Sequence, residues 1–381
     1  MKQAKSRPLP TNRQIEARFT LIRTLTAAVI ALAGCLALIL TVSEEPWEAF
    51  SAFLFGPLES AKNIATVFET AAPLVYAGLA VSVMFSCNQF NMAAEGAVYV
   101  GGLAASAVAV RLSLPVVAHP ALALLLGGAA GALVCFLPGL LKVKLGATEV
   151  VSSLMLNYIV LYLGVYVLNY LLADPQAGFP ATERLPETAK LPTLISRTHF
   201  HVGTVLAFAL CAVVYLYLYK SRQGYAIRMV GQNEKFARYS GIKVGGTILS
   251  AQLAGGFLAG MGGASEILGS YSRFQWVALP GYGFDGVIVA TLAGNNPLLV
   301  PLGALFLGYL RCGADIMARR SDVATEVLSI VQGTIILLVA SKLFLQRIKH
   351  KYIVSVAEKR EAQAAGADAP AAEAEGGAAH A

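Results

Sequence analysis

Polar side chains interrupt an otherwise apolar stretch at residues 86–102, and they are the first candidates for chemistry in this sequence. The stretch reads SCNQFNMAAEGAVYVGG and contains Asn91 and Glu95. A carboxylate at membrane depth is costly unless it faces protein or water. Glu95 opens a small-residue run, and the free amides and dipole of a helix start favour an anion. Two interpretations are open: a structural cap or interhelical hydrogen-bond hub, and a group lining a translocation path.

A second polar set occurs in GATEVVSSLMLNYIVLYL, residues 146–163. Ser153 and Asn157 lie four residues apart, and therefore on one face of a predicted helix. Such a face can line a cavity, but Ser and Asn also form hydrogen bonds between helices in membrane bundles. Packing is favoured for Ser153 and a cavity for Asn157.

A third polar and glycine-rich stretch covers residues 251–286. Gly256 and Gly260 have the spacing that lets helices approach closely. The glycines after Met261 are expected to break or bend the helix, because glycine is a poor helix former.

The same stretch continues with an acid and several aromatic residues near its outer end. Glu266 is followed by Phe274 and Trp276. An interfacial aromatic belt is the favoured interpretation for Trp276, whereas Phe274 is also a candidate for stacking on a planar or sugar-ring ligand. Asp285 then opens a small-residue run much as Glu95 does, and paired interrupted segments point to a central site between two repeats of a transporter.

Residues 220–246 form a basic loop that contains a short amphipathic helix. Phe236 and Tyr239 share one face of the segment NEKFARYS, and Asn233 is the expected helix cap. An exposed aromatic face is suited to docking in a groove on a soluble partner. This interpretation is favoured over a helix lying on lipid. The residues assigned to docking are Gly231, Gln232, Asn233, Glu234, Phe236, Ala237, Tyr239 and Gly241.

The elements that position these residues are predicted to be membrane-spanning helices. The chain is 56% hydrophobic and only 13% charged, whereas soluble domains carry about 25% charged residues. A spanning helix needs about 20 mostly apolar residues. We therefore expect an all-α polytopic membrane helical bundle of about ten transmembrane helices, of which the third and the eighth are short or broken. The predicted spans are 20–42, 67–85, 97–110, 118–141, 150–172, 202–219, 248–268, 283–292, 298–317 and 323–345.

Positive charge predicts the orientation of the chain. Lys and Arg gather in the leader, after the fourth span, between the sixth and seventh spans, and after the last. Ten spans with both termini in the cytoplasm place all four groups on the cytoplasmic side. The predicted organisation is a basic leader at 1–19, a permease domain at 20–345 and a tail at 346–381. The tail is expected to be disordered from about residue 358, and 174–197 is the longest external loop.

Several kinds of chemistry have no motif in this sequence. There is no GxxxxGK[ST] phosphate loop, HExxH, GxSxG or Cys/His zinc spacing. The five cysteines are isolated and fit neither a disulfide framework nor a metal site. We expect a non-enzymatic chain that binds no cofactor or metal itself and draws energy from outside, with ATP and Mg²⁺ on a partner ATPase. An ion-coupled secondary transporter is the alternative from another class.

Four runs of sequence resemble one known family. FNMAAEG (90–96), GATEVVSSLMLNYI (146–159), GYAIRMVGQNEKFARYSGI (224–242) and PGYGFDGVIVATLAGNNP (280–297) occur in the order and spacing of inner-membrane ABC importer permeases. That family serves simple sugars, nucleosides and branched-chain amino acids, and the nucleoside-type branch is the most similar. The family motif has Gln where this chain has Ala97, a position close to Glu95.

The resemblance implies a division of labour between subunits. A second permease, identical or different, would pair with this chain in the inner membrane of a bacterium. ATPase subunits would dock at the coupling helix, which corresponds to residues 231–241, and a solute-binding protein outside would deliver the solute. The expected solute is a nucleoside, with a simple sugar such as ribose or galactose as the alternative. The pathway candidates are Asn91, Glu95, Asn157, Glu266, Asp285 and Phe274.

Overall fold

The structure is a computed structural model that describes residues 44–195 and 198–321, together with isolated positions near 33–40 and at 333. The chain divides into two units, Met1–Leu38 with Gly333–Ala381, and Ile39–Gln332. The helical bundle described below belongs to the second unit. The predicted leader, the last span and the tail lie outside the described residues, as does nearly all of the first span.

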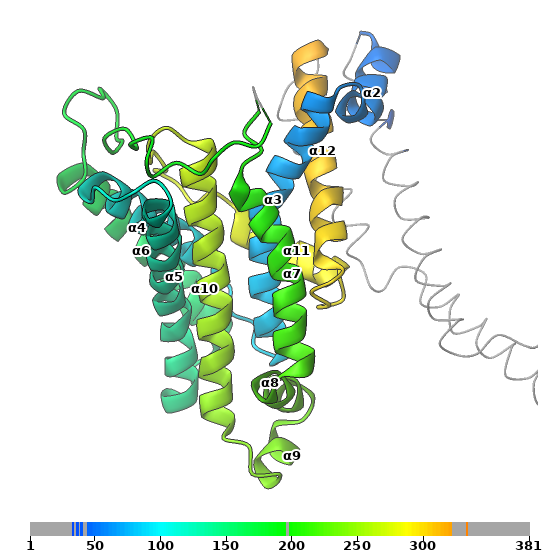
Figure 1. Ribbon diagram of the computed structural model, residues 1–381. Coiled ribbons are helices and arrows are strands. Elements are labelled where there is room, and N and C mark those ends of the chain that lie inside the picture. Colours follow the sequence, from blue (N-terminus) through cyan, green and yellow to red (C-terminus); the bar gives the residue numbers. More distant parts are fainter. Residues whose placement is uncertain are drawn as a thin grey trace, which may run out of the picture. The chain divides into compact units, whose positions relative to one another are not determined.

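The described residues form a bundle of helices, drawn in Figure 1. Their bounds are α2 Pro46–Phe55, the short 3₁₀ helix η1 Gly56–Leu58, α3 Ala61–Ser86, α4 Ala94–Arg111, α5 Ala118–Leu145, α6 Glu149–Tyr170, α7 Val202–Lys220, α8 Arg222–Gln232, α9 Glu234–Tyr239, α10 Val244–Ser270, α11 Tyr282–Leu292 and α12 Val300–Arg320.

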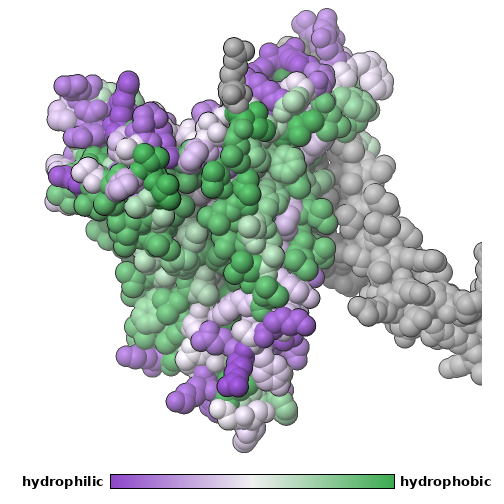
Figure 2. Space-filling model, in the orientation of Figure 1, coloured by the Kyte–Doolittle hydropathy of each residue, from purple (hydrophilic) through white to green (hydrophobic). Residues whose placement is uncertain are grey.

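Each predicted span from the second to the ninth coincides with a helix, from α3 to α12. Six of the described helices, α3, α5, α6, α7, α10 and α12, are long and apolar enough to cross a membrane. The two spans expected to be short are α4, with 18 residues, and α11, with 11. In Figure 2 an apolar surface band separates polar surfaces at the two ends of the bundle. This distribution is the one expected for a helical bundle in lipid.

Small residues let the central helices approach one another closely. A Cβ added to Gly256 of α10 would lie 2.6 Å from the carbonyl oxygen of Gly131 on α5. A Cβ added to Gly263 would collide with the carbonyl oxygen of Val98 on α4. The predicted close approach at the glycines of α10 is therefore confirmed, and these contacts place α10 against both α4 and α5.

The predicted break after Met261 is wrong. Helix α10 continues without interruption from Val244 to Ser270. The glycines that follow Met261 face neighbours that leave no room for a side chain, such as Tyr76 beside Gly262 and Val98 beside Gly263. Tertiary packing at these positions outweighs the weak helix propensity of glycine.

Two non-helical segments bring the candidate site together. Residues 87–93 connect α3 to α4, and residues 271–281 connect α10 to α11. Gly281, the last residue of the second segment, has a φ of +86°, a conformation that favours glycine. Because both segments lead into helix starts, they bring the amino-terminal ends of α4 and α11 into the interior of the bundle.

Candidate functional site

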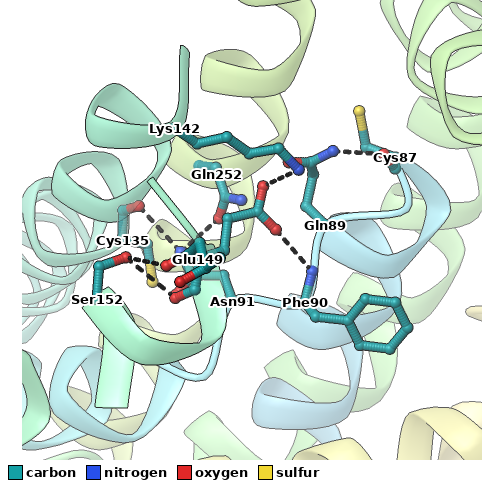
Figure 3. Close-up of polar contacts among 10 residues, drawn as sticks. Cys87, Gln89, Phe90, Asn91, Cys135, Lys142, Glu149, Ser152 and Gln252 are labelled. Atoms are coloured by element: carbon teal, nitrogen blue, oxygen red, sulfur yellow. Dashed lines mark hydrogen bonds and ion pairs between the residues drawn. The ribbon is translucent and has the colours of Figure 1, made fainter. Parts of the chain in front are cut away.

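The 87–93 segment is held by an ion pair between α5 and α6 (Figure 3). Lys142 of α5 pairs with Glu149 at the start of α6. Lys142 Nζ also donates to Gln89 Oε1 at 2.9 Å, and the Phe90 amide donates to Glu149 Oε2 at 3.0 Å. A buried carboxylate is stabilised by this combination of a cation and an amide donor. Glu149 therefore fixes the polypeptide between α3 and α4.

Asn91 lies in the same segment and is fully buried. Its Nδ2 donates to the Cys135 carbonyl oxygen at 3.1 Å and to Gln252 Oε1 at 2.6 Å (Figure 3). Its Oδ1 accepts the Ala93 amide at 2.8 Å. Asn91 thus connects the start of α4 to α5 and α10.

Ser153 and Asn157 of α6 both bond to the start of α4. Ser153 Oγ accepts the Met92 amide at 3.0 Å, and Asn157 Oδ1 accepts the Gly96 amide at 3.0 Å. Asn157 Nδ2 donates to the Met92 carbonyl oxygen at 3.0 Å. Hydrogen bonding between helices, the favoured interpretation for Ser153, is what the structure shows for that residue. It also accounts for both polar groups of Asn157, which is buried and for which a cavity was favoured. These side chains satisfy amides that a helix start leaves unpaired.

Glu95 of α4 caps a different helix from its own. Glu95 Oε1 accepts the Gly281 amide at 2.5 Å, and Oε2 accepts the Gly283 amide at 2.6 Å and the Phe284 amide at 3.3 Å. The residue is fully buried. Three amides and the dipole of α11 thus stabilise one carboxylate. Of the two interpretations of Glu95, the interhelical hub accounts for both of its oxygens.

A second group of polar side chains gathers on α10, α11 and α12. The Tyr282 hydroxyl lies 3.5 Å from Glu266 Oε1. Asp285, one turn further along α11, pairs with Arg311 of α12. The structure therefore places the predicted residues Glu266 and Asp285 on neighbouring helices. The sequence interpretation missed Arg311. Arg311 could have been identified from the sequence, because it is a lone cation inside the predicted span 298–317 and ionisable residues at membrane depth are usually functional.

Phe274 belongs to a buried aromatic cluster in the 271–281 segment. Its ring centroid lies 5.7 Å from that of Tyr99 and 5.5 Å from that of Trp276. Trp276 also contacts Tyr271 and Tyr282. The belt expected for Trp276 is wrong, because this side chain is only 8% exposed and packs against protein.

The loop between α6 and α7 packs onto this segment. The Thr182 amide donates to the Phe274 carbonyl oxygen at 3.0 Å, and the Phe274 amide donates to Thr182 Oγ1 at 3.1 Å. Asp174 pairs with Arg273 at 3.2 Å. The loop predicted to be external thus packs on the first residues of the 271–281 segment. It lies at the end of the bundle opposite α9 (Figure 1).

The predicted amphipathic helix of the 220–246 loop is confirmed as α9. The Asn233 side chain accepts the Phe236 amide at 3.0 Å, as its predicted role as a cap requires. Phe236 is 55% exposed and Tyr239 is 91% exposed, whereas Ala237 is buried. Gly241, with a φ of +82°, ends the turn after α9. One side of this short helix is therefore anchored, and its aromatic side is exposed.

Gly231, which the sequence analysis assigned to docking, is not part of the α9 helix. It lies near the end of α8, which runs to Gln232, and the chain breaks at Asn233 instead. A Cβ at Gly231 would collide with the Ser86 carbonyl oxygen at the end of α3. Gly231 therefore allows α8 to pack on the bundle. The exposed polar residues around α9 are Gln232, Asn233, Glu234, Lys235, Arg238 and Tyr239, which surround a shallow surface hollow.

The arrangement defines a class of protein. An apolar bundle with interrupted segments in its interior, capped helix starts and an exposed amphipathic helix at one end has the architecture of a membrane transport subunit. No group of three or more His, Cys, Asp or Glu residues in the described part of the chain is placed to hold a metal ion.

The chain belongs to the family described as the branched-chain amino acid transport system / permease component, whose model matches residues 63–340. It is 34% identical to the guanosine ABC transporter permease protein NupP of Bacillus subtilis, covering 84% of this chain and 93% of that protein. It is 32% identical to the glucose ABC transporter permease protein TsgB13 of Haloferax volcanii, covering 90% and 91%. It is 26% identical to the nucleoside ABC transporter permease protein NupB of Lactococcus lactis, covering 81% and 87%.

No solved structure matches the chain. The relatives confirm the resemblance found in the sequence, to ABC transporter permeases of nucleosides and sugars. Membership of this family implies a membrane setting, an ATPase partner and a substrate-binding partner.

Proposed function

We propose that this chain is the permease subunit of an ABC importer that moves a nucleoside across the inner membrane of a bacterium. The observation that carries the proposal is the exposed aromatic face of α9, which projects from a membrane bundle whose relatives are ABC permeases. A surface helix with free aromatic side chains is suited to a groove on a soluble protein. We assign that groove to a separate ATPase, which binds ATP and Mg²⁺, and we place α9 in the cytoplasm.

The transport mechanism would be alternating access. Closure of the ATPases would push on α9, and α8 would transmit the movement to the bundle through its packing at the end of α3. A second permease subunit and a solute-binding protein complete the proposed complex. Asn91, Glu95 and Asn157 would keep the start of α4 fixed to α5, α6, α10 and α11 during this movement.

A nucleoside is favoured as the solute because two of the relatives named above are permeases of guanosine or nucleosides. Sugar transport is the second candidate, since the relative from Haloferax volcanii is a glucose permease with 32% identity. Both kinds of solute are uncharged and rich in hydroxyl groups. Of the aromatic residues near the 271–281 segment, the partly exposed Tyr282 is suited to stack on either kind of ring, whereas Phe274 is fully buried.

The proposal is tested by uptake into proteoliposomes that contain this chain, its partner permease, the ATPase and the solute-binding protein. Labelled guanosine is expected to accumulate only with ATP, and labelled glucose is expected not to accumulate. Accumulation of glucose alone would transfer the assignment to sugars. Uptake by this chain alone, driven by an ion gradient without ATP, would instead establish a secondary transporter.

A further inference from the structure

The ion pair between Asp285 and Arg311 lies where charges are costly. Arg311 is the twelfth residue of α12, one of the helices long and apolar enough to cross a membrane. At 1.5 Å per residue it is about 17 Å from the helix start, close to the middle of the span. A charged side chain at this depth must face protein or a water-filled cavity.

The pair is not closed off by the protein around it. The Arg311 side chain is 32% exposed, and the Asp285 side chain is 15% exposed. An ion pair with a purely structural role at this depth would have both groups covered and their remaining hydrogen-bonding capacity satisfied. Contact with hydrocarbon would leave most of the five guanidinium N–H donors without acceptors. The exposed part of Arg311 therefore requires water, a polar ligand or a polar group of the second permease subunit.

Other polar groups continue from the pair toward the 171–201 loop. The Tyr282 hydroxyl, three residues before Asp285 on α11, lies 3.5 Å from Glu266 Oε1 on α10. The ion pair and this contact thus form one row of ionisable groups from α10, α11 and α12.

We propose that this row lines the solute path and that Arg311 contacts the solute. The proposal rests on the transport function proposed above and deepens it. Asp285 balances the charge of Arg311 and leaves guanidinium N–H groups free to donate to carbonyl or hydroxyl oxygens. Glu266 can accept hydrogen bonds from hydroxyl groups, as it does from Tyr282. This combination suits an uncharged solute that carries both kinds of group, as a nucleoside does.

The proposal separates two kinds of acid in the interior. Glu95 uses both of its oxygens on the amides of α11 and is fully buried. It is a positioning residue, since it fixes the helix start from which Tyr282 and Asp285 project. Contact with the solute is assigned to the exposed pair.

The test is the accessibility of position 311 to a charged thiol reagent in the complete complex in vesicles. The Arg311→Cys variant is expected to react at least tenfold faster with a membrane-impermeant methanethiosulfonate than Val213→Cys. Val213 is the matched control because it is an exposed apolar residue in the middle of α7. The unsubstituted chain measures the background reaction of its own cysteines.

Protection by solute completes the test. Saturating guanosine is expected to slow the reaction at position 311 at least threefold, and saturating glucose is expected to have no effect. A reaction rate equal to that of Val213→Cys would overturn the proposal, and so would fast reaction that neither solute slows. Protection by glucose alone would confirm that Arg311 lines the solute path but would show that the solute is not a nucleoside. Failure of this proposal and failure of the nucleoside assignment are therefore distinguishable.

A milder variant covers the case in which Arg311→Cys fails to assemble. Arg311→Lys keeps the charge and the pairing with Asp285 but loses the planar fork of donors. It is expected to raise the KM of guanosine uptake about tenfold. An unchanged KM in this variant would also overturn the proposal.

Discussion

The junction of α4 with α11 and the tip at α9 both contain polar side chains, but these are buried at the junction and exposed at the tip. At the junction, Glu95 and Asn157 bond to backbone amides of other helices and are buried. At the tip, Phe236 and Tyr239 project into open space. Polar groups inside the bilayer must be satisfied by the chain itself, because lipid offers no partners. Side chains at the tip remain available to another protein.

Burial thus separates the residues that hold the bundle together from the residues that are available to bind a partner. Substitutions at the junction should lower the stability of the bundle and reduce transport as a consequence. Substitutions on the free face of α9 should leave stability unchanged and remove transport directly. The following changes test that separation, from the largest expected loss of stability to the smallest.

Glu95→Ala should have the largest effect on stability. It leaves the Gly281, Gly283 and Phe284 amides without their acceptor, and each unsatisfied buried amide costs about 1–3 kcal/mol. A loss on the order of 5 kcal/mol is expected in SDS-induced unfolding. Glu48→Ala is the control, since Glu48 also lies in the first turn of a helix but is exposed. Equal stability of the two variants would mean that the Glu95 contacts do not hold α11.

Gly263→Ala tests the packing of α10 against α4. Its Cβ would collide with the Val98 carbonyl oxygen, and overpacking of this kind costs about 1–3 kcal/mol. Gly246→Ala on the same helix is the matched control, because a Cβ there meets nothing within 4 Å. The control should gain about 0.5–1 kcal/mol. A stable Gly263→Ala protein would show that α10 is not packed as closely as described.

Asn157→Ala should have an intermediate effect. It removes the acceptor of the Gly96 amide and the donor to the Met92 carbonyl oxygen, at a cost of about 2 kcal/mol. Asn169→Ala, an exposed position on the same helix, should change stability by less than about 0.5 kcal/mol. If Asn157→Ala instead kept full stability and changed solute selectivity, the cavity interpretation would be restored.

Asn233→Ala should have the smallest effect, confined to α9. Loss of the side-chain cap on the Phe236 amide costs about 1 kcal/mol locally. Faster hydrogen exchange at Phe236 is expected, with no change in the unfolding of the bundle. Asn233→Asp keeps an acceptor and should exchange at the original rate. Unchanged exchange in the alanine variant would contradict the capped geometry.

The helices were predictable from the sequence, because a run of about 20 apolar residues is itself the property that lets a helix cross a membrane. The cap of α9 was also local, with Asn233 three residues before Phe236. The partners of Glu95 were not predictable, since Glu95 and Gly281 are 186 residues apart and backbone amides leave no trace in a sequence. Glycines in α10 misled the prediction because their effect depends on what faces them, which only the packed structure shows.

Phe236→Asp tests the central claim most directly. It places a charge on the aromatic face of α9, at a side chain that is 55% exposed, so little buried packing is lost. We expect unchanged SDS-induced unfolding, at least tenfold weaker capture of the ATPase and loss of ATP-driven guanosine uptake, whereas Phe236→Leu should keep most of the uptake. Uptake by Phe236→Asp at the rate of the unsubstituted protein would contradict the account and remove α9 from the mechanism.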